Sequence, residues 1–151
     1  MNEQRLLELG IELPPAPKPA GNYAPAVLCG NLLYLAGQGP RAIDGSLHYG
    51  TVGGDVSIEH ARTHARLCGL NLLAAARQAL GTLDRVERVV RVLGFVRAVP
   101  DFGSHPHVID GCSDLFLEVF GEAGRGARAA VGAGSLPRGI TTEVEAIFLV
   151  A

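Results

Sequence analysis

The residues between Asp55 and Gly81 constrain the fold of this chain more than any other segment. Asp55 and Ser57 are candidate N-caps, and Gly81 is a candidate C-terminal stop signal. Between them, small and aliphatic side chains recur at helical spacing along one face: Ala61, Ala65, Cys68, Leu72, Ala75 and Ala79. We therefore predict one long amphipathic helix over Ile58–Leu80, whose apolar face must pack against another layer.

The other apolar runs predict strands and a second helix around this long helix. A Gly30-Asn31 pair separates apolar runs at 27–29 and 32–36, which is typical of a hairpin with a two-residue turn. Further strands are predicted at 86–99, 128–133 and 142–150, a second amphipathic helix at about 106–120, and a short helix at 2–9. The order β-β-α-β-α-β-β predicts an α+β, two-layer fold, with both main helices on one face of a mixed sheet.

The length of 151 residues suits a single domain over 1–151. Its first twenty residues are expected to form the short helix and then an extended surface strap, because four prolines fall in the seven residues from Leu13 to Pro19. Charged residues make up 19% and hydrophobic residues 48%, a charge-poor balance that favours self-association. We expect the sheet face that carries Val89 and Val92 to be buried against other subunits.

Charge and cysteine usage exclude several classes of protein. A net charge of −2 without any basic run argues against extended RNA or DNA binding. No apolar stretch is long enough to span a membrane, and the N-terminus, with Glu3 and Glu8, lacks the apolar segment of a secretion signal. Cys29, Cys68 and Cys112 are odd in number and lack metal or redox spacing, which favours reduced thiols in a cytoplasmic protein.

Some patterns suggest chemistry but have a simpler explanation. His60 and His64 lie four apart on the long helix and could ligate a metal, yet no third ligand is evident. We expect a solvated helix face there and no metal. Cys112 is interpreted as a small hydrophobic residue rather than a nucleophile. The segment 37–39 lacks the Lys-Ser/Thr pair and the helix start of a phosphate loop.

Three charged residues in small or apolar strands need an explanation. Arg128 lies among alanines and glycines, where an unpaired charge is costly. Glu143 and Glu145 are two apart in the last strand, so they point to one face while Val144 points to the other. Two interpretations are open: Arg128 forms a cross-strand ion pair with one of the two glutamates, or these charges serve a ligand.

Five short motifs occur in a fixed order from Gly21 to the last strand. They are Gly21-Asn22-Tyr23, residues 30–38 (GNLLYLAGQ), residues 127–131 (ARAAV), Leu136-Pro137 and residues 143–146 (EVEA). Together they resemble the RidA/YjgF/UK114 family, also called endoribonuclease L-PSP, and within it the chorismate-mutase-like subgroup. No single motif is specific for this family, but the combination of the five motifs at these separations is specific for it.

The resemblance implies a chorismate-mutase-like fold assembled as a homotrimer, with ligand clefts between subunits. It also implies hydrolysis of reactive enamines and imines, such as 2-aminoacrylate, to 2-keto acids and ammonia. By motif match, Arg128 grips the substrate carboxylate, Glu143 positions the hydrolytic water, and Tyr23 lies in the cleft. No metal or organic cofactor is expected, because an imine is already electrophilic. The substrate-binding set implied is Arg128, Tyr23, Gly37, Asp110 and Ala130.

Four positions depart from the pattern of many family members. Ala36 replaces a serine before the Gly-Gln pair, Ala129 and Ala130 replace Ser/Thr and Cys after the arginine, and Asp110 replaces an asparagine. The cleft is then less polar, and Asp110 would repel an anionic substrate. Two alternatives to a deaminase stay open: a non-catalytic trimer that binds small carboxylates or a protein partner, and an endoribonuclease or translation inhibitor, which only the family's naming suggests.

Overall fold

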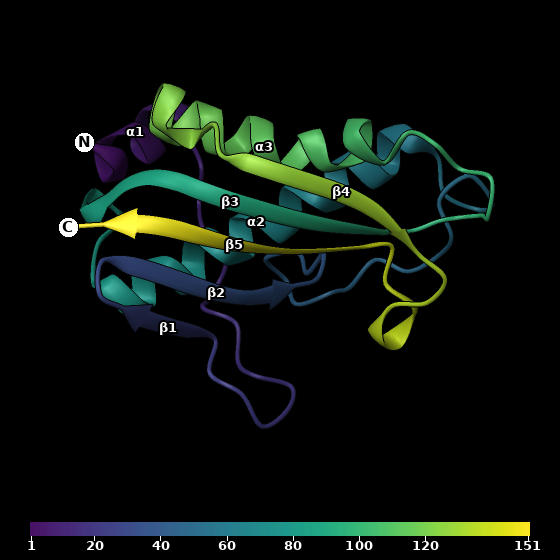
Figure 1. Cartoon of the computed structure of the whole chain (residues 1–151), viewed down its shortest axis with the longest axis horizontal. Helices are drawn as coiled ribbons and strands as arrows, with labels where there is room; N and C mark the ends of the chain where they lie inside the picture. Colours follow the sequence, from purple (N-terminus) through teal and green to yellow (C-terminus); the bar gives the residue numbers. More distant parts are fainter.

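A computed structural model describes residues 1–151 of the chain. Its five strands form one sheet in the order β1-β2-β5-β3-β4, and two long helices, α2 and α3, pack side by side against one face (Figure 1). The predicted α+β order and layering are confirmed. The bounds are α1 Asn2–Leu9, β1 Ala26–Cys29, β2 Leu32–Gln38, α2 Ile58–Leu80, β3 Val86–Arg97, α3 His105–Phe120, β4 Ala127–Ala133 and β5 Thr142–Val150.

Local signals set the ends of these elements. The Ser57 side chain accepts the His60 N–H at 3.1 Å and caps α2, which ends at Gly81 with a left-handed φ of 83°. In the β1–β2 hairpin only Gly30 takes a positive φ, of 60°, and Asn31 does not. β3 ends at Arg97, two residues earlier than predicted, because Ala98 pairs with Val52 in an isolated bridge.

The sheet is mixed, and its order decides where the functional side chains lie. β3 and β4 are parallel and are connected through α3, whereas β1–β2, β2–β5 and β5–β3 are antiparallel. A parallel pair needs such a crossover, because a short turn cannot join two strands that run in the same direction. In the strand order β4 is the last strand at one edge, and β3 separates it from β5.

One face of the sheet and the two helices enclose the core. Alternate residues of β3 and β5 point into it, among them Val92, Val144 and Phe148, all at most 2% exposed. The expectation that Val89 and Val92 face other subunits is wrong, since both lie under the helices of their own chain. Ala79, predicted on the apolar face of α2, is exposed. The helices approach closely because Gly111 leaves room for the Arg62 carbonyl.

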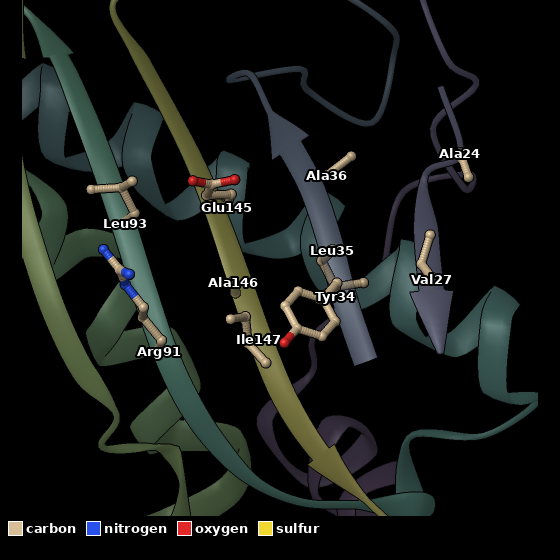
Figure 2. Close-up of a pocket in the computed structure, with 10 residues that line it drawn as sticks. All are labelled: Ala24, Val27, Tyr34, Leu35, Ala36, Arg91, Leu93, Glu145, Ala146 and Ile147. Carbon is tan, nitrogen blue, oxygen red and sulfur yellow. The ribbon is translucent and has the colours of Figure 1, made fainter. Parts of the chain in front are cut away.

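The opposite face of the sheet has no helix over it. Side chains of β2, β3 and β5 line a shallow cavity of about 420 Å³ there. Figure 2 shows Tyr34, Leu93 and Ile147 along this surface, with the charged groups of Arg91 and Glu145 on neighbouring strands. Tyr34 is 45% exposed, so a large aromatic group on this face is without cover within one chain.

The N-terminal helix α1 forms hydrogen bonds with the last turn of α2 and with the α2–β3 connection. Leu6 of α1 is buried, the Glu3 carboxylate accepts from Arg77 at 2.9 Å, and the Asn2 amide donates to the Leu83 carbonyl at 2.7 Å. The proline strap follows α1 and crosses to the β1 side of the molecule (Figure 1). None of the helices combines the length and the apolar character needed to cross a membrane.

Candidate functional site

A cavity of about 620 Å³ lies where the strap, the end of β2 and the loop before β5 meet. Three of the six predicted site residues, Tyr23, Gly37 and Glu143, line it together. Glu145 lines it as well, and it also borders the shallow cavity of the open sheet face. Both glutamates therefore face a ligand-sized space, as their two-residue spacing predicted.

Glu143 lies half-buried beside an irregular stretch of β2. Leu35 pairs with Ala146 and Gln38 with Val144, so Ala36 and Gly37 together oppose the single residue Glu145. This is a β-bulge, a feature that commonly re-aims strands beside active sites. A Cβ on Gly37 would lie 3.3 Å from both Cγ and Cδ of Glu143. The glycine thus leaves the space that the carboxyl group occupies.

The environment of Glu143 disfavours its charge. Burial first, and the neighbouring Glu145 carboxylate second, raise the pKa of Glu143 above its ordinary value. No hydrogen bond to the carboxyl group offsets these two effects. A carboxyl group with a raised pKa can take up and release a proton closer to neutral pH than an exposed glutamate can.

Tyr23 is placed by a tight turn at the end of the strap. Its N–H donates to the Gly21 carbonyl at 3.1 Å, and its hydroxyl oxygen accepts the Ala20 N–H at 3.1 Å. Because the hydroxyl oxygen accepts this bond, the phenolic proton is free to donate to a ligand. The ring is 49% exposed at the wall of the cavity.

Arg128 lies outside this cavity, on the other side of the sheet. Arg128 pairs in register with Val92, which is buried against the helices. Glu143 pairs with Phe95, three residues after Val92 on β3, and residues an odd number apart on a strand point to opposite faces. The interpretation as an Arg128–glutamate cross-strand pair is therefore wrong, because β3 separates the two strands and the side chains point to opposite faces. Arg128 instead donates to the Asp110 carboxylate at 2.6 Å.

A profile of the protein family described as "YjgF/chorismate_mutase-like, putative endoribonuclease" matches residues 3–145, nearly the whole chain. The chain belongs to the YjgF family. The resemblance seen in the sequence is confirmed, and the fold agrees with it.

Relatives of this YjgF family member cover almost all of it. "Protein TCP17" of Trypanosoma cruzi is 43% identical over 94% of this chain and 89% of its own length. A "2-iminobutanoate/2-iminopropanoate deaminase" of Dermatophagoides farinae is 30% identical over 93% of this chain and 94% of its own. The crystal structure of Atu1372 from Agrobacterium tumefaciens, a protein of unknown function, is 44% identical and superposes with a TM-score of 0.91 over 99% of this chain and 92% of that one.

The remaining predicted residues of this YjgF protein do not reach the cavity. Asp110 is bound to Arg128, at the edge of the sheet beside α3. Ala130 pairs in register with the buried Gly94 and packs against the core cluster, so it faces the helices. Ser113, which the sequence analysis did not select, lies with its Oγ 3.1 Å from Nη1 of Arg128. It is one turn after Asp110 on α3, a spacing that could have identified it.

The cavity also holds residues that sequence reasoning missed. Lys18 of the strap, Arg41 after β2 and Arg138 in the Pro137–Gly139 turn line it together with the two glutamates. These three cations come from segments far apart in the sequence, and only the Leu136-Pro137 motif lies beside one of them.

The two histidines of α2, His60 and His64, lie in different environments. His64 is half-buried, stacks on His48 with ring centroids 4.5 Å apart, and its Nδ1 lies 2.8 Å from the Thr141 hydroxyl. The prediction of a solvated helix face is confirmed for His60, which is exposed, and is wrong for His64. Burial, then the nearby His48 and His60, lower the pKa of His64 to about 4. No three His, Cys, Asp or Glu side chains are arranged to hold a metal ion.

All three cysteines are free thiols. Cys68 and Cys112 are fully buried, and burial raises the pKa of Cys68 to about 12 and that of Cys112 well above its ordinary value. A buried thiol with a raised pKa is a poor nucleophile. The interpretation of Cys112 as a small hydrophobic residue agrees with this environment.

Proposed function

We propose that this chain hydrolyses reactive enamine and imine intermediates, such as 2-aminoacrylate and its imine tautomer, to 2-keto acids and ammonia. The observation that carries the proposal is the half-buried Glu143, with a raised pKa, in a cavity that it shares with Tyr23 and Gly37. The relative named as a 2-iminobutanoate/2-iminopropanoate deaminase supports the same reaction class.

The proposed active form is a homotrimer with its ligand clefts between subunits. Within one chain Arg128 and Glu143 point to opposite faces of the sheet, so one ligand cannot contact both. A second copy that presents its β4 edge to the cavity would supply the missing guanidinium. Such a contact joins two different surfaces, and contacts of this kind close into rings when the rotation allows it.

In this cleft each residue has a defined role. The Arg128 guanidinium of a neighbouring copy binds the substrate carboxylate through two parallel N–H donors, a geometry that lysine cannot offer. The Tyr23 hydroxyl donates to the ligand. The Glu143 carboxylate holds a water molecule against the imine carbon, which places the attacking oxygen before the reaction begins.

The proposed reaction needs only proton transfers and water. The enamine first takes a proton from water on its terminal carbon and becomes the protonated imine. Water then adds to the imine carbon while Glu143 accepts a water proton, forming a C–O bond and leaving an amine on the same carbon. Glu143 returns the proton to that nitrogen, the C–N bond breaks as the new hydroxyl group gives its proton to the Glu143 carboxylate, and a 2-keto acid and ammonia leave.

The test is an assay in which 2-iminopropanoate is generated from alanine by an amino-acid oxidase and its decay is followed by a carbonyl trap. We expect the protein to accelerate decay, Glu143→Gln to lower kcat/KM about 100-fold, and Arg128→Ala to lower it at least about tenfold. Arg88→Gln, a change at an exposed arginine outside both cavities, is the control. Equal rates with and without the protein would refute the proposal.

A second candidate is a trimer that binds small carboxylates without turnover. The observation that favours it is Ala36, which brings no polar side chain to the cavity at the position where many family members have a serine. The same assay separates the two functions. Binding of 2-oxobutanoate that Arg128→Ala abolishes, with no acceleration of imine decay, would establish this second candidate.

A further inference from the structure

The wall of the 620 Å³ cavity carries an unexplained group of cations. Lys18, Arg41 and Arg138 all line it. None of them takes part in any of the seven ion pairs of the chain. The guanidinium of Arg41 donates to the Gly45 carbonyl at 2.8 Å, and no side-chain partner holds either of the others. Three positive charges thus face one cavity without an internal carboxylate to neutralise them.

The cations outnumber the carboxylates that share the cavity. Glu143 and Glu145 are the acidic residues that line it, and the pKa of Glu143 is raised, so its charge is the more easily neutralised of the two. The balance is therefore positive. A positive wall with free guanidinium and ammonium groups attracts and binds anions.

The backbone at Arg138 is a second, independent sign. Arg138 has a φ of 57° and is the one non-glycine residue of the chain in the left-handed region. A side chain is disfavoured in that conformation, and residues kept there gather at binding and catalytic sites. Its neighbour Gly139 also has a positive φ, of 74°. A glycine at position 138 would avoid the unfavourable conformation, yet the chain has an arginine there, and this arginine lines the cavity.

The volume of the cavity also favours a ligand that reaches the three cations. A three-carbon imino acid would fill only a small part of about 620 Å³, a volume in the range that holds much larger organic ligands. A ligand whose reacting carbon lies at Glu143 has room to extend toward the cations.

We propose that Lys18, Arg41 and Arg138 form a second anion-binding subsite, and that the preferred ligands are dicarboxylic imino and keto acids with the carbon skeleton of glutamate. The second subsite rests on the proposed function in two respects. Arg128 of a neighbouring copy binds the first carboxylate, and the reaction takes place at Glu143. The distal carboxylate is bound by the cation group. Hydrolysis then converts a 2-iminodicarboxylate and water to the 2-oxodicarboxylate and ammonia.

The experiment is calorimetric titration of the full-length protein with two keto acids of equal chain length, 2-oxoglutarate and 2-oxopentanoate. They differ only in the distal carboxylate. We expect 2-oxoglutarate to bind at least about fivefold more tightly at low salt, as several partly exposed charge contacts allow. The difference should shrink as added salt screens them.

Substitutions assign the effect to the subsite. Arg138→Gln and Lys18→Gln should weaken binding of 2-oxoglutarate several-fold and leave 2-oxopentanoate unchanged, while Arg138→Lys should keep most of the preference because it keeps the charge. Arg88→Gln removes an equal charge outside the cavity and should change neither affinity. Arg128→Gln should weaken both ligands alike.

The outcomes separate the two proposals. Equal affinity for the two keto acids, both dependent on Arg128, would overturn the second subsite and leave the proposed function standing. A preference that survives in both Arg138→Gln and Lys18→Gln would also overturn it. Failure of both ligands to bind would overturn the subsite together with the carboxylate site on which the proposed function depends.

Discussion

The Arg128 guanidinium donates through Nη1 to the Asp110 carboxylate over 2.6 Å. The Ser113 hydroxyl lies 3.1 Å from the same nitrogen, and Nη2 donates to the Pro106 carbonyl at 3.4 Å. The arginine that the proposed reaction needs for its substrate is thus already bound by a carboxylate of its own chain. The Asp110 side chain is 41% exposed, so water and a ligand can reach this ion pair. Asp110 therefore competes with an incoming carboxylate.

Asp110→Asn should strengthen binding of small carboxylates. A neutral amide cannot match the attraction of an ionised carboxylate for the guanidinium, so the cost of displacing it falls. We expect the Kd of 2-oxobutanoate, measured by titration calorimetry, to fall about two- to fivefold, the worth of one partly exposed ion pair. Asp114→Asn is the control, because Asp114 lies on the same helix as Asp110 but pairs with Arg62 of α2, at 2.6 Å. Weaker binding by the Asp110 variant would contradict the competition.

Gly37→Ala should impair catalysis with little effect on stability. The added Cβ would come within 3.3 Å of the Glu143 carboxyl group and displace it from its position beside the bulge. Misplacing a catalytic group by a fraction of an ångström lowers kcat, here by about tenfold or more. Thermal unfolding should shift by only a few degrees, roughly as for a change of 1 kcal/mol.

The matched control is Gly103→Ala, since an added Cβ there would meet no atom within 4 Å. Its kcat should equal that of the unchanged protein. A Gly37→Ala variant with full activity would show that the space beside Glu143 is not needed for the reaction.

The elements could be predicted from the sequence because their signals are local. The spacing of small residues between Ser57 and Gly81 indicates a helix whatever element packs against it. Both ends of α2 lie where the capping residues predict them. The alternation in β5 likewise places Glu143 and Glu145 on one face, as the structure has them.

The side of the sheet on which Arg128 points could not be predicted in the same way. That side depends on β4 lying next to β3 and on the register of Val92 with Arg128, which long-range pairing sets. The subunit face was misassigned for the same reason: Val89 and Val92 are apolar on a strand that is apolar on both faces. The cation group was missed because Lys18 and Arg138 meet only in the folded chain.

His64 should make the stability of the fold fall in mildly acidic solution. The folded state holds its pKa at about 4, against an ordinary value of 6.5, so the folded state binds its proton less readily than the unfolded state. Its contribution is complete above pH 6.5 and is lost as the pH falls toward 4. Because the ring is only half-buried, we expect a total loss of about 1–2 kcal/mol.

The measurement for His64 is urea unfolding at several pH values between 7.5 and 4.5. His64→Gln removes the titrating group and should flatten the fall in free energy of unfolding, relative to the unchanged protein, whereas His107→Gln, at an exposed histidine, should not. The same pH dependence in the His64 variant would assign the fall to other groups.

Glu145→Gln should move the acid limb of the activity profile to lower pH. In the proposed reaction the Glu143 carboxylate must be ionised to accept a proton from water, so activity falls as the pH drops through its pKa. Burial and the Glu145 charge both raise that pKa. Removing the second charge lowers it and extends activity into more acidic solution. The profile of kcat/KM against pH measures the shift, with Glu122→Gln, at an exposed glutamate that does not line the cavity, as control. A limb that stays in place, or that moves to higher pH, would mean that Glu143 is not the group whose ionisation limits the reaction.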